Sequence, residues 1–497
     1  MSNSGENTLY FAHQVRELDH NAIEAGISGF ELMRHAGEAA FELIKRLWPE
    51  ARGISVVCGS GNNAGDGYVV AALAARAGLD VQLVALREPA ALKGEASQAV
   101  AMARDEQLVP LTWSEFNRFE GEIIVDALLG TGISGDVQAP YDEAINAING
   151  SVLPVLALDL PSGLDADTGV VLGQAVEAQH TITFIGRKFG LLTGQAPDYT
   201  GTLHFAALGV DARVRERVAS AGTLLQPERL KQSLPRRKPT THKGHCGHLL
   251  VVGGRPGLGG STIMTAETAA RVGAGLVSLA TDAVHIPPAL ARCPEMMVKA
   301  VRNALDLEEL LEMADGVAIG PGLGQGAWGE GLLDAVLAAE GPRVVDADGL
   351  NLLASNYTSL RRDDWVLTPH PGEAARLLNC SVKDVQADRR EAALELQHRR
   401  GGVVVLKGAG TLVVGGQAAA QVFVNPYGNP GMASGGMGDV LGGIIASLIV
   451  QGLDLLEASA SGVLLHGMAA DMAAAEGGER GLLATDLACY ARRLANP

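Results

Sequence analysis

The sequence predicts an α/β protein of two domains, each built on a parallel β-sheet that helices cover on both faces. Three observations lead to this prediction. The 497-residue chain is too long for one ordinary hydrophobic core. Short apolar runs rich in β-branched residues alternate with stretches of helical periodicity. The 63 glycines follow no collagen-like period and suit many tight turns between strands and helices.

The N-terminal half begins with helices and continues as alternating strands and helices. Apolar residues recur at helical spacing over residues 8–48. From residue 53 onward the short apolar runs are typical of strands in a sheet that is buried on both faces. These predicted strands are Ile54–Cys58, Val81–Leu86, Ile123–Asp126, Val155–Asp159 and Thr181–Ile185.

A polar and basic stretch with several prolines, residues 226–243, has the composition of a linker or a domain edge. We therefore expect one domain over residues 1–215 and a second over 222–497. In the second domain a glycine-rich turn precedes an apolar helix predicted at Asp439–Val450. Its predicted strands are His248–Val252, Leu276–Ala280, Gly316–Ile319, Arg343–Asp346, Trp365–Leu367 and Val403–Leu406.

The charge and the apolar content exclude several classes of protein. The formal net charge of −17 argues against a nucleic-acid partner, because phosphate backbones require clustered lysine and arginine. The longest apolar stretch, Val440–Val450, is too short to cross a bilayer, so no membrane partner is expected. Five scattered cysteines without a Cys-x-x-Cys pair indicate reduced thiols and a cytoplasmic location. We expect a homo-oligomer.

Polar loops follow three predicted strands of the N-terminal half. They are Gly59–Gly67, Asp126–Asp136 and Asp159–Asp165. In a parallel sheet the carboxyl ends of all strands lie at one edge, where ligands bind. We therefore expect the three loops to converge on one pocket.

The loop Gly59–Gly67 has two plain interpretations. It loosely matches the fingerprint of a dinucleotide site, although Asp66 would repel a pyrophosphate there. It could equally be a purely structural glycine turn. A P-loop is excluded, because the chain contains no Gly-Lys dipeptide.

A third interpretation uses the side chains of the loops. Asn63, Asp126 and Ser162 supply hard oxygen ligands with only one full charge. Such a set suits an oxygen-coordinated cation better than zinc. Asp159 ends a strand without a cation nearby in the sequence, and it is a candidate proton-transfer group.

Five segments of this half resemble the NAD(P)H-hydrate epimerase family, and the resemblance spans residues 8–212. They are Gln14–Asp19, Leu32–Gly37, Gly59–Gly67, Val125–Gly132 and Leu158–Asp165. The resemblance implies a catalytic Asp159 and K⁺ bound by Asn63, Asp126 and Ser162. It further implies that the hydrated dinucleotide is held by Asn62, Asn63, Ala64, Gly65, Asp66, Gly130, Thr131, Gly132, Ile133, Ser134, Gly135, Asp136, Tyr141 and Asp159.

The chain departs from the family pattern at one position, because the usual loop has two glycines where this sequence has Ala64-Gly65. Alanine is small, so we expect no harm unless Ala64 must adopt a positive φ. The reaction that the resemblance implies inverts the carbon that bears the added hydroxyl, next to the ring nitrogen.

The C-terminal half has a second set of loops at predicted strand ends. Gly435, Gly436 and Gly438 precede a helix start predicted at Asp439, where free N–H groups and the helix dipole favour an anion. Asp439 itself can be a plain N-cap, a base beside the anion site, or both. Lys407 also ends a predicted strand. It could contact a nucleotide there, or it could simply be a solvated lysine.

These loops resemble the ribokinase-like superfamily, and more closely its ADP/ATP-dependent NAD(P)H-hydrate dehydratase branch, over residues 225–493. The segments concerned are Lys243–Gly247, Gly320–Gly324, Thr368–Glu373, Lys407–Thr411 and Gly435–Asp439. The resemblance implies ADP as the phosphate donor, and phosphoryl transfer calls for Mg²⁺. It implies nucleotide binding by Lys407, Gly408, Ala409, Gly410, Thr411 and Gly438, and hydrate binding by Gly322, Gly324, His370 and the catalytic Asp439.

The sequence thus predicts an N-terminal Rossmann-like domain that interconverts the R and S hydrates of NADH and NADPH, and a ribokinase-like domain that dehydrates the S form with ADP. Its partners would be these small molecules. Two alternatives remain open at this point. One is a small-molecule hydroxyl kinase with a non-catalytic nucleotide-binding N-terminal domain. The other is an N-terminal module that binds RNA or a partner protein.

Overall fold

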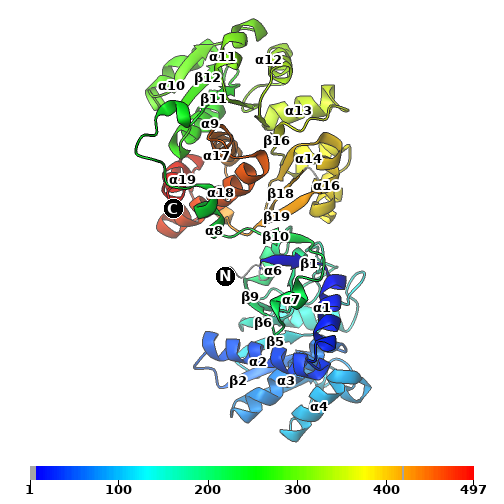
Figure 1. Cartoon of the computed structure of the whole chain (residues 1–497). Coiled ribbons are helices and arrows are strands. Elements are labelled where there is room, and N and C mark those ends of the chain that lie inside the picture. Colours follow the sequence, from blue (N-terminus) through cyan, green and yellow to red (C-terminus); the bar gives the residue numbers. More distant parts are fainter. Residues whose placement is uncertain (1–6, 417–418) are drawn as a thin grey trace. The chain divides into compact units, whose positions relative to one another are not determined.

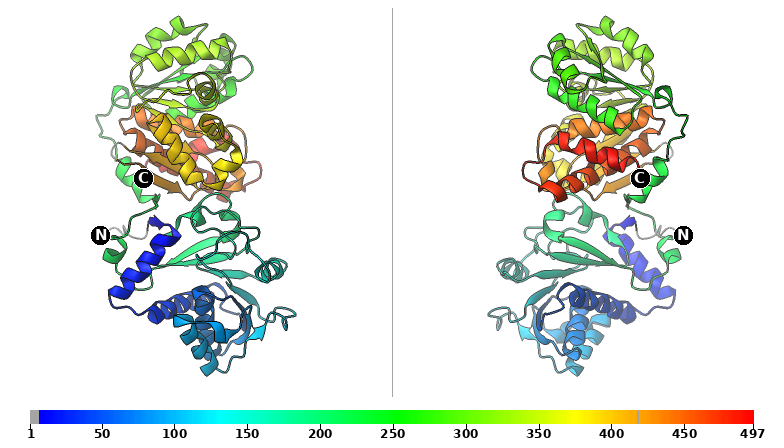
Figure 2. Two further views of the ribbon diagram at one scale, coloured as in Figure 1. Left: turned by 90° about the vertical axis from the view of Figure 1, so that its right-hand side faces the viewer. Right: turned by 90° about the vertical axis from the view of Figure 1, so that its left-hand side faces the viewer.

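The computed structural model describes residues 7–416 and 419–497, and the chain divides into two compact units, Met1–Thr223 and Leu224–Pro497 (Figure 1). Each unit contains a mostly parallel sheet with helices on both faces, which confirms the predicted α/β class (Figure 2). Within the described residues, no helix is both long enough and apolar enough to cross a membrane.

The first unit has a fully parallel sheet in the order β4-β3-β2-β5-β6-β7-β9. Its strands are β2 (Gly53–Cys58), β3 (Asp80–Ala85), β4 (Leu111–Thr112), β5 (Ile123–Ala127), β6 (Val155–Leu158), β7 (His180–Phe184) and β9 (Thr202–Ala206). The short strand β1 (Thr8–Tyr10) pairs in parallel with β8 (Arg187–Lys188) and antiparallel with β10 (Gly222–Leu224).

Helices cover both faces of this sheet because side chains alternate along each strand. Val56 and Cys58 pack in the cluster formed with α1 (Ala12–Glu24), α2 (Gly29–Leu47), α3 (Asn62–Arg76) and α4 (Gly94–Asp105). Val57 points the other way, into the cluster that α5 (Tyr141–Asn149) completes. The short helices α6 (Pro197–Thr200) and α7 (Ala212–Arg215) lie in later connections.

The second unit has a sheet in the order β13-β12-β11-β14-β15-β16-β17-β18-β19. Pairing is parallel up to β17 and antiparallel for the last two strands. The strands are β11 (His248–Val252), β12 (Leu276–Thr281), β13 (Met297–Ala300), β14 (Gly316–Ile319), β15 (Arg343–Val345), β16 (Trp365–Leu367), β17 (Val403–Leu406), β18 (Thr411–Gly415) and β19 (Gln421–Asn425).

The core of the second unit is centred on α17 (Met437–Val450), a helix whose residues are almost all buried. It packs with α9 (Gly259–Val272) and α18 (Leu455–Gly477), and α19 (Leu487–Leu494) packs against both of these helices. The other helices are α8 (Glu228–Ser233), α10 (Ile286–Arg292), α11 (Glu308–Met313), α12 (Ala327–Ala338), α13 (Ala347–Asn356), α14 (Pro371–Leu378), α15 (Val382–Ala387) and α16 (Arg389–Arg400).

Two predicted helix starts are wrong, and both differences affect a site. Helix α3 begins at Asn62, so only Gly59–Gly61 forms a loop before it. Helix α17 begins at Met437 with Gly436 as its N-cap, so Asp439 lies inside the first turn and the N-cap interpretation of Asp439 is wrong. Glycine at φ +92° makes this start geometrically easy, since no side chain opposes the left-handed conformation.

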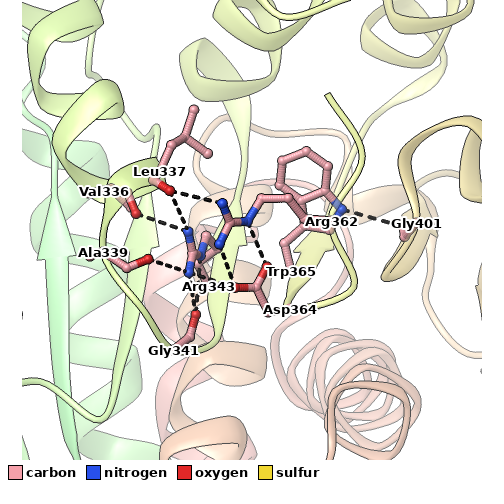
Figure 3. A network of polar contacts seen from close by, with 9 residues as sticks. All are labelled: Val336, Leu337, Ala339, Gly341, Arg343, Arg362, Asp364, Trp365 and Gly401. Atoms are coloured by element: carbon pink, nitrogen blue, oxygen red, sulfur yellow. Dashed lines mark hydrogen bonds and ion pairs between the residues drawn. The ribbon is translucent and has the colours of Figure 1, made fainter. Parts of the chain in front are cut away.

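A buried arginine ties the start of β15 to the end of α12 (Figure 3). The guanidinium of Arg343, whose side chain is 1% exposed, donates to the Val336 and Ala339 carbonyls at 3.0 and 3.1 Å. It also donates to the Asp364 carboxylate at 2.8 Å, which Arg362 contacts from the other side at 2.8 Å. The fork satisfies carbonyls that the helix leaves without partners at its C-terminal end.

We predict that Arg343→Lys destabilises the second unit by about 2–4 kcal/mol, because one ammonium cannot replace the planar fork and leaves carbonyls unpaired. Thermal unfolding of the full chain measures the loss. The matched control is Arg361→Lys, an exposed arginine 3.6 Å from Asp363, which should change stability by less than about 0.5 kcal/mol. Equal shifts for the two variants would contradict a structural role of the network.

Candidate active sites

A cavity of about 510 Å³ lies in the first unit at the carboxyl edge of its sheet. The loops that follow the neighbouring strands β2 and β5 both line it. Strand β3 lies on one side of β2, and β5 lies on the other, so the order of the strands reverses at β2. In open α/β sheets ligands bind at such a point.

Most of the predicted contact residues of the first domain meet at this cavity. Ala64 and Gly65 lie buried within α3, and Ala64 has helical rather than positive φ, so alanine is accommodated there. The Tyr141 hydroxyl donates at 3.0 Å to Ser60, which lines the cavity. Ser134, Gly135 and Asp136 are exposed and do not line it. The predicted residues that line it are Asn62, Asn63, Asp66, Gly130, Thr131, Gly132, Ile133 and Asp159.

The three predicted cation ligands lie side by side at the inner end of the loops. Ser162 donates its hydroxyl to Asp126 at 2.6 Å and accepts from the Leu129 N–H at 2.9 Å. Asn63 donates to the Leu129 carbonyl at 3.1 Å, while its own buried Oδ1 has no hydrogen-bond partner. Burial raises the pKa of Asp126 to about 6, against hydrogen bonds from Ser162 and Leu128 that lower it.

The unsatisfied Oδ1 of Asn63 indicates that this set fits a cation. A buried acceptor without a donor is costly, and a cation would satisfy it. The set combines one carboxylate with neutral amide and hydroxyl oxygens, which are hard ligands of the alkali and alkaline-earth type. Among the described residues, no group of three or more His, Cys, Asp or Glu side chains could hold a metal. The residues present therefore fit a weakly charged, oxygen-bound ion.

Asp159 forms an ion pair with Lys188, a side chain only 1% exposed. Lys188 also donates to the Thr183 hydroxyl at 3.1 Å and to the Phe184 carbonyl at 3.2 Å. Asp159 has a φ of +66°, an unusual conformation that aspartate tolerates better than most residues. Sequence reasoning missed Lys188, which follows β7 and is distant from Asp159 along the chain.

More negative than positive charge faces this cavity. Asp19 and Asp66 line it together with Asp159 and Lys188. Burial raises the pKa of Asp19 to about 6, and Lys188 lowers it less than burial raises it. Burial also raises the pKa of Asp66 well above its ordinary value, and the charges of Asp159 and Asp19 add to the effect. The cavity can therefore hold protons near neutral pH.

The second unit brings its predicted residues together around Asp346, a buried aspartate that directly follows β15. Lys407 donates to Asp346 at 2.7 Å and lies 3.8 Å from the buried Glu373. A side chain at Gly438 would approach the Lys407 ammonium to 3.2 Å and the Asp346 carboxylate to 3.5 Å. Asp346 and Glu373 were not among the predicted site residues, although Asp346 ends a buried strand just as Asp159 does.

The charges of this cluster again favour bound protons. Burial raises the pKa of Asp439 to about 6. The charge of Asp346 raises this pKa further, and a hydrogen bond from Ser261 and the charge of Lys407 lower it. Burial likewise raises the pKa of Glu373 to about 7, against Lys407, which lowers it. The positive charge of Lys407 thus faces the carboxyl groups of Asp346, Glu373 and Asp439 at the carboxyl edge of the sheet.

The remaining predicted residues of the second domain lie on neighbouring strand ends. His370 is the N-cap of α14. Its imidazole Nδ1 accepts from the Gly372 N–H at 2.9 Å, and its backbone N–H donates to the Glu373 carboxylate at 2.8 Å. Gly322 has a φ of +57°, and a side chain there would come within 2.4 Å of the Leu258 carbonyl. Gly324 donates its N–H to Asp348 at 2.8 Å.

The predicted nucleotide loop, residues 407–411, is open to solvent on one side. Gly408 and Ala409 are exposed, Gly410 has a φ of +62°, and the Thr411 hydroxyl donates to the Gly408 carbonyl at 2.8 Å. The buried Arg389 donates to the Lys407 carbonyl at 3.2 Å and so supports the loop from beneath.

The segment Lys243–Gly247 does not join this site. It precedes β11, at the amino edge of the sheet. A side chain at Gly247 would meet the Val450 carbonyl at 2.0 Å, and one at Gly275 would meet the Lys243 carbonyl at 1.9 Å. The segment therefore permits close backbone packing at the end of α17.

Comparison with known proteins matches both halves of the chain. A sequence model of NAD(P)H-hydrate dehydratase matches residues 249–493, and one of the YjeF-related protein N-terminus matches residues 29–190. The bifunctional NAD(P)H-hydrate repair enzyme of Coxiella burnetii is 50% identical over 98% of this chain and 99% of that protein. The enzyme of the same name from Escherichia coli is 45% identical over 99% of this chain and 94% of that protein.

The chain belongs to the family of bifunctional NAD(P)H-hydrate repair enzymes. A solved ribokinase-like superfamily protein from Enterococcus faecalis is 32% identical and covers 55% of this chain and 96% of its own, with a TM-score of 0.51. The ribokinase-like fold predicted for the second domain of this repair enzyme is thereby confirmed.

We predict that Asp439→Asn stabilises the repair enzyme at pH 8 by about 3 kcal/mol, since burial lifts the pKa of Asp439 from 3.8 to about 6. Between those values the folded state binds more protons than the unfolded state. Stability therefore falls as pH rises through this window, and the aspartate is most costly above it.

Thermal unfolding of both chains from pH 4 to pH 8 measures the effect. The difference between the variant and the original chain should grow with pH. Asp363→Asn, which removes an exposed carboxylate of the same unit, should show no such trend. A difference that is independent of pH would contradict the raised pKa.

Proposed function

We propose that the two sites act in sequence on hydrated nicotinamide coenzymes. The first unit interconverts the R and S hydrates of NADH and NADPH, and the second dehydrates the S hydrate while ADP is converted to AMP and phosphate. The observation that carries this proposal is the pair of acidic sites, each with one lysine, at the carboxyl edges of two sheets in a chain of this family.

In the first unit, Asp159 is the proposed proton-transfer group. The lone pair of the ring nitrogen expels the hydroxyl group, and water returns to the opposite face of the ring. Asp159 takes the proton of the incoming water, and its ion pair with Lys188 holds it in position. Residues 60–63 and 128–133 line the cavity in which the reacting ring would lie.

K⁺ is the proposed ion at Asn63, Asp126 and Ser162. The unsatisfied Asn63 Oδ1 and the Leu129 carbonyl beside it support this assignment. The ion would supply a fixed positive charge for a polar group of the substrate. Asp126 and Ser162 also hold the loop after β5 through the Leu128 and Leu129 N–H groups, and this loop lines the cavity.

In the second unit, Asp439 is the proposed base for phosphoryl transfer. It accepts the proton of the hydrate hydroxyl as that oxygen attacks the terminal phosphate of ADP. The N–H groups at the start of α17 face the transferred phosphate, with Gly438 leaving room for it beside Lys407. The ring nitrogen then expels phosphate, a far better leaving group than hydroxide. Mg²⁺ offsets the phosphate charge when bound.

The contact residues follow from these two assignments. The proposed nucleotide site is the loop 407–411 with Gly438, and the proposed hydrate site adds His370, Gly322 and Gly324 to Asp439. A stable phosphorylated product would favour the alternative, a small-molecule hydroxyl kinase. The acidic cavity of the first unit and the similarity of the whole chain to bifunctional repair enzymes favour the repair reaction.

We predict that aspartate-to-asparagine substitutions separate the two activities. Asp439→Asn should lower the dehydration of either hydrate by about 10²–10⁴-fold, because the hydroxyl loses its base. Asp159→Asn should leave dehydration of the S hydrate intact and reduce use of the R hydrate to the rate of spontaneous inversion. Dihydronicotinamide absorbance, followed with each purified hydrate and ADP, measures both.

The control is the exposed Asp105→Asn at the end of α4, which should change neither rate. Undiminished use of the R hydrate by Asp159→Asn would overturn the assignment of the first site. Undiminished dehydration by Asp439→Asn would overturn that of the second.

A further inference from the structure

We propose that Asp19 is a second catalytic residue of the first unit and forms an acid–base pair with Asp159. The proposal rests on epimerisation in this cavity as the function of the unit. Asp19 donates a proton to the departing hydroxyl group on one face of the ring, while Asp159 accepts one from water on the other face.

The position of Asp19 in the fold gives it no structural task. It lies in the middle of α1, so it caps neither end of that helix. Its neighbours Leu18 and Ala22 are fully buried, so this side of α1 faces inward. Among the described residues, no hydrogen bond or ion pair engages the Asp19 carboxylate, which lines the cavity instead. An inward carboxylate without a partner lowers stability, as is common where a side chain serves catalysis.

The charges that face Asp19 come from every element around it. Asp66 from α3, Asp159 after β6 and Glu95 from α4 line the same cavity, with Lys188 from β8 and Arg16 from α1. Arg16 is exposed, and its Nε donates to the carbonyl of Ala12 on its own helix at 3.4 Å. Lys188 is committed to Asp159.

This arrangement gives the two aspartates different surroundings. Asp159 is ion-paired with Lys188, which holds its carboxylate in place to accept a proton from water. Burial raises the pKa of Asp19 to about 6, with Lys188 opposing and Asp159 adding to the effect. Two carboxyl groups with different surroundings can thus serve as acid and base in the same reaction.

Every proton is accounted for in the proposed step. The lone pair of the ring nitrogen forms a double bond to the carbon as the C–O bond breaks, and the bonding electrons leave with the oxygen. The departing oxygen takes the Asp19 proton and leaves as water. A second water forms the new C–O bond on the opposite face and gives its proton to Asp159. One proton has then moved from Asp19 to Asp159, and the reverse epimerisation, or exchange with solvent, restores the starting state.

The test uses the full chain and follows conversion of the R hydrate with excess ADP, so that the second unit reports each S hydrate formed. For the original chain, kcat/KM should fall on the alkaline side with a midpoint near pH 6, as Asp19 loses its proton. Asp19→Asn should lower kcat by about 10²-fold or more, change KM little, and abolish the alkaline fall. Asp19→Glu keeps an acid at this position and should recover part of the lost rate.

The matched control is Glu17→Gln, which removes an exposed negative charge from the same helix and should behave like the original chain. Direct use of the S hydrate should be normal in every variant. If Asp19→Asn retains the original rate and pH profile, the proposal is wrong while epimerisation stands. If the original chain shows no epimerisation, the proposed function of this unit fails and this proposal with it.

The original chain provides a measurement that does not depend on folding of a variant. A kcat/KM for the R hydrate that stays level from pH 5 to pH 8, after subtraction of the spontaneous rate, would overturn the proposal even if Asp19→Asn fails to fold.

Discussion

One lysine faced by an excess of carboxyl groups is the feature on which both sites depend. In the first unit Lys188 pairs with Asp159 beside Asp19 and Asp66, and in the second Lys407 pairs with Asp346 beside Glu373 and Asp439. Burial makes each unpaired carboxylate costly, so these groups tend to keep protons that they would lose in water. Each site thereby combines an aspartate that is ion-paired with lysine and neighbouring carboxyl groups whose pKa is raised by burial.

The parallel sheets create this concentration of charge. All strands of such a sheet end at one edge, so aspartates that are distant in the sequence meet there. Asp159 follows β6 and Asp346 follows β15, while the lysines come from β8 and from the end of β17. The free N–H groups at the start of α3 and α17 add positive potential, which offsets part of the acidic excess for an anionic substrate.

The sequence was sufficient to predict the α/β class and every inner strand with parallel neighbours on both sides, because runs such as Val155–Leu158 are apolar on both faces. Edge and hairpin strands such as β9, β13, β18 and β19 were missed, since their residues are more mixed or their turns less marked. Asn63, Asp126 and Ser162 were predicted as a set, and the structure brings them together. Lys188, Asp19 and Glu373 could not be assigned, because what matters is the charge they face across the fold. Asp346 ends a buried strand and could have been found by the rule that identified Asp159.

The two units are proposed to break the same carbon–oxygen bond in different ways. The first protonates the hydroxyl and lets water replace it, and the second phosphorylates it so that phosphate departs. A heavy-oxygen label in that hydroxyl group separates the two routes. With labelled S hydrate and the Asp159→Asn chain, the label should appear in inorganic phosphate, seen as an isotope shift in the phosphorus NMR spectrum. With labelled R hydrate and the original chain, the phosphate should be free of label, because solvent water has replaced the hydroxyl. Label released from the S hydrate into water instead of phosphate would contradict phosphorylation of the hydroxyl.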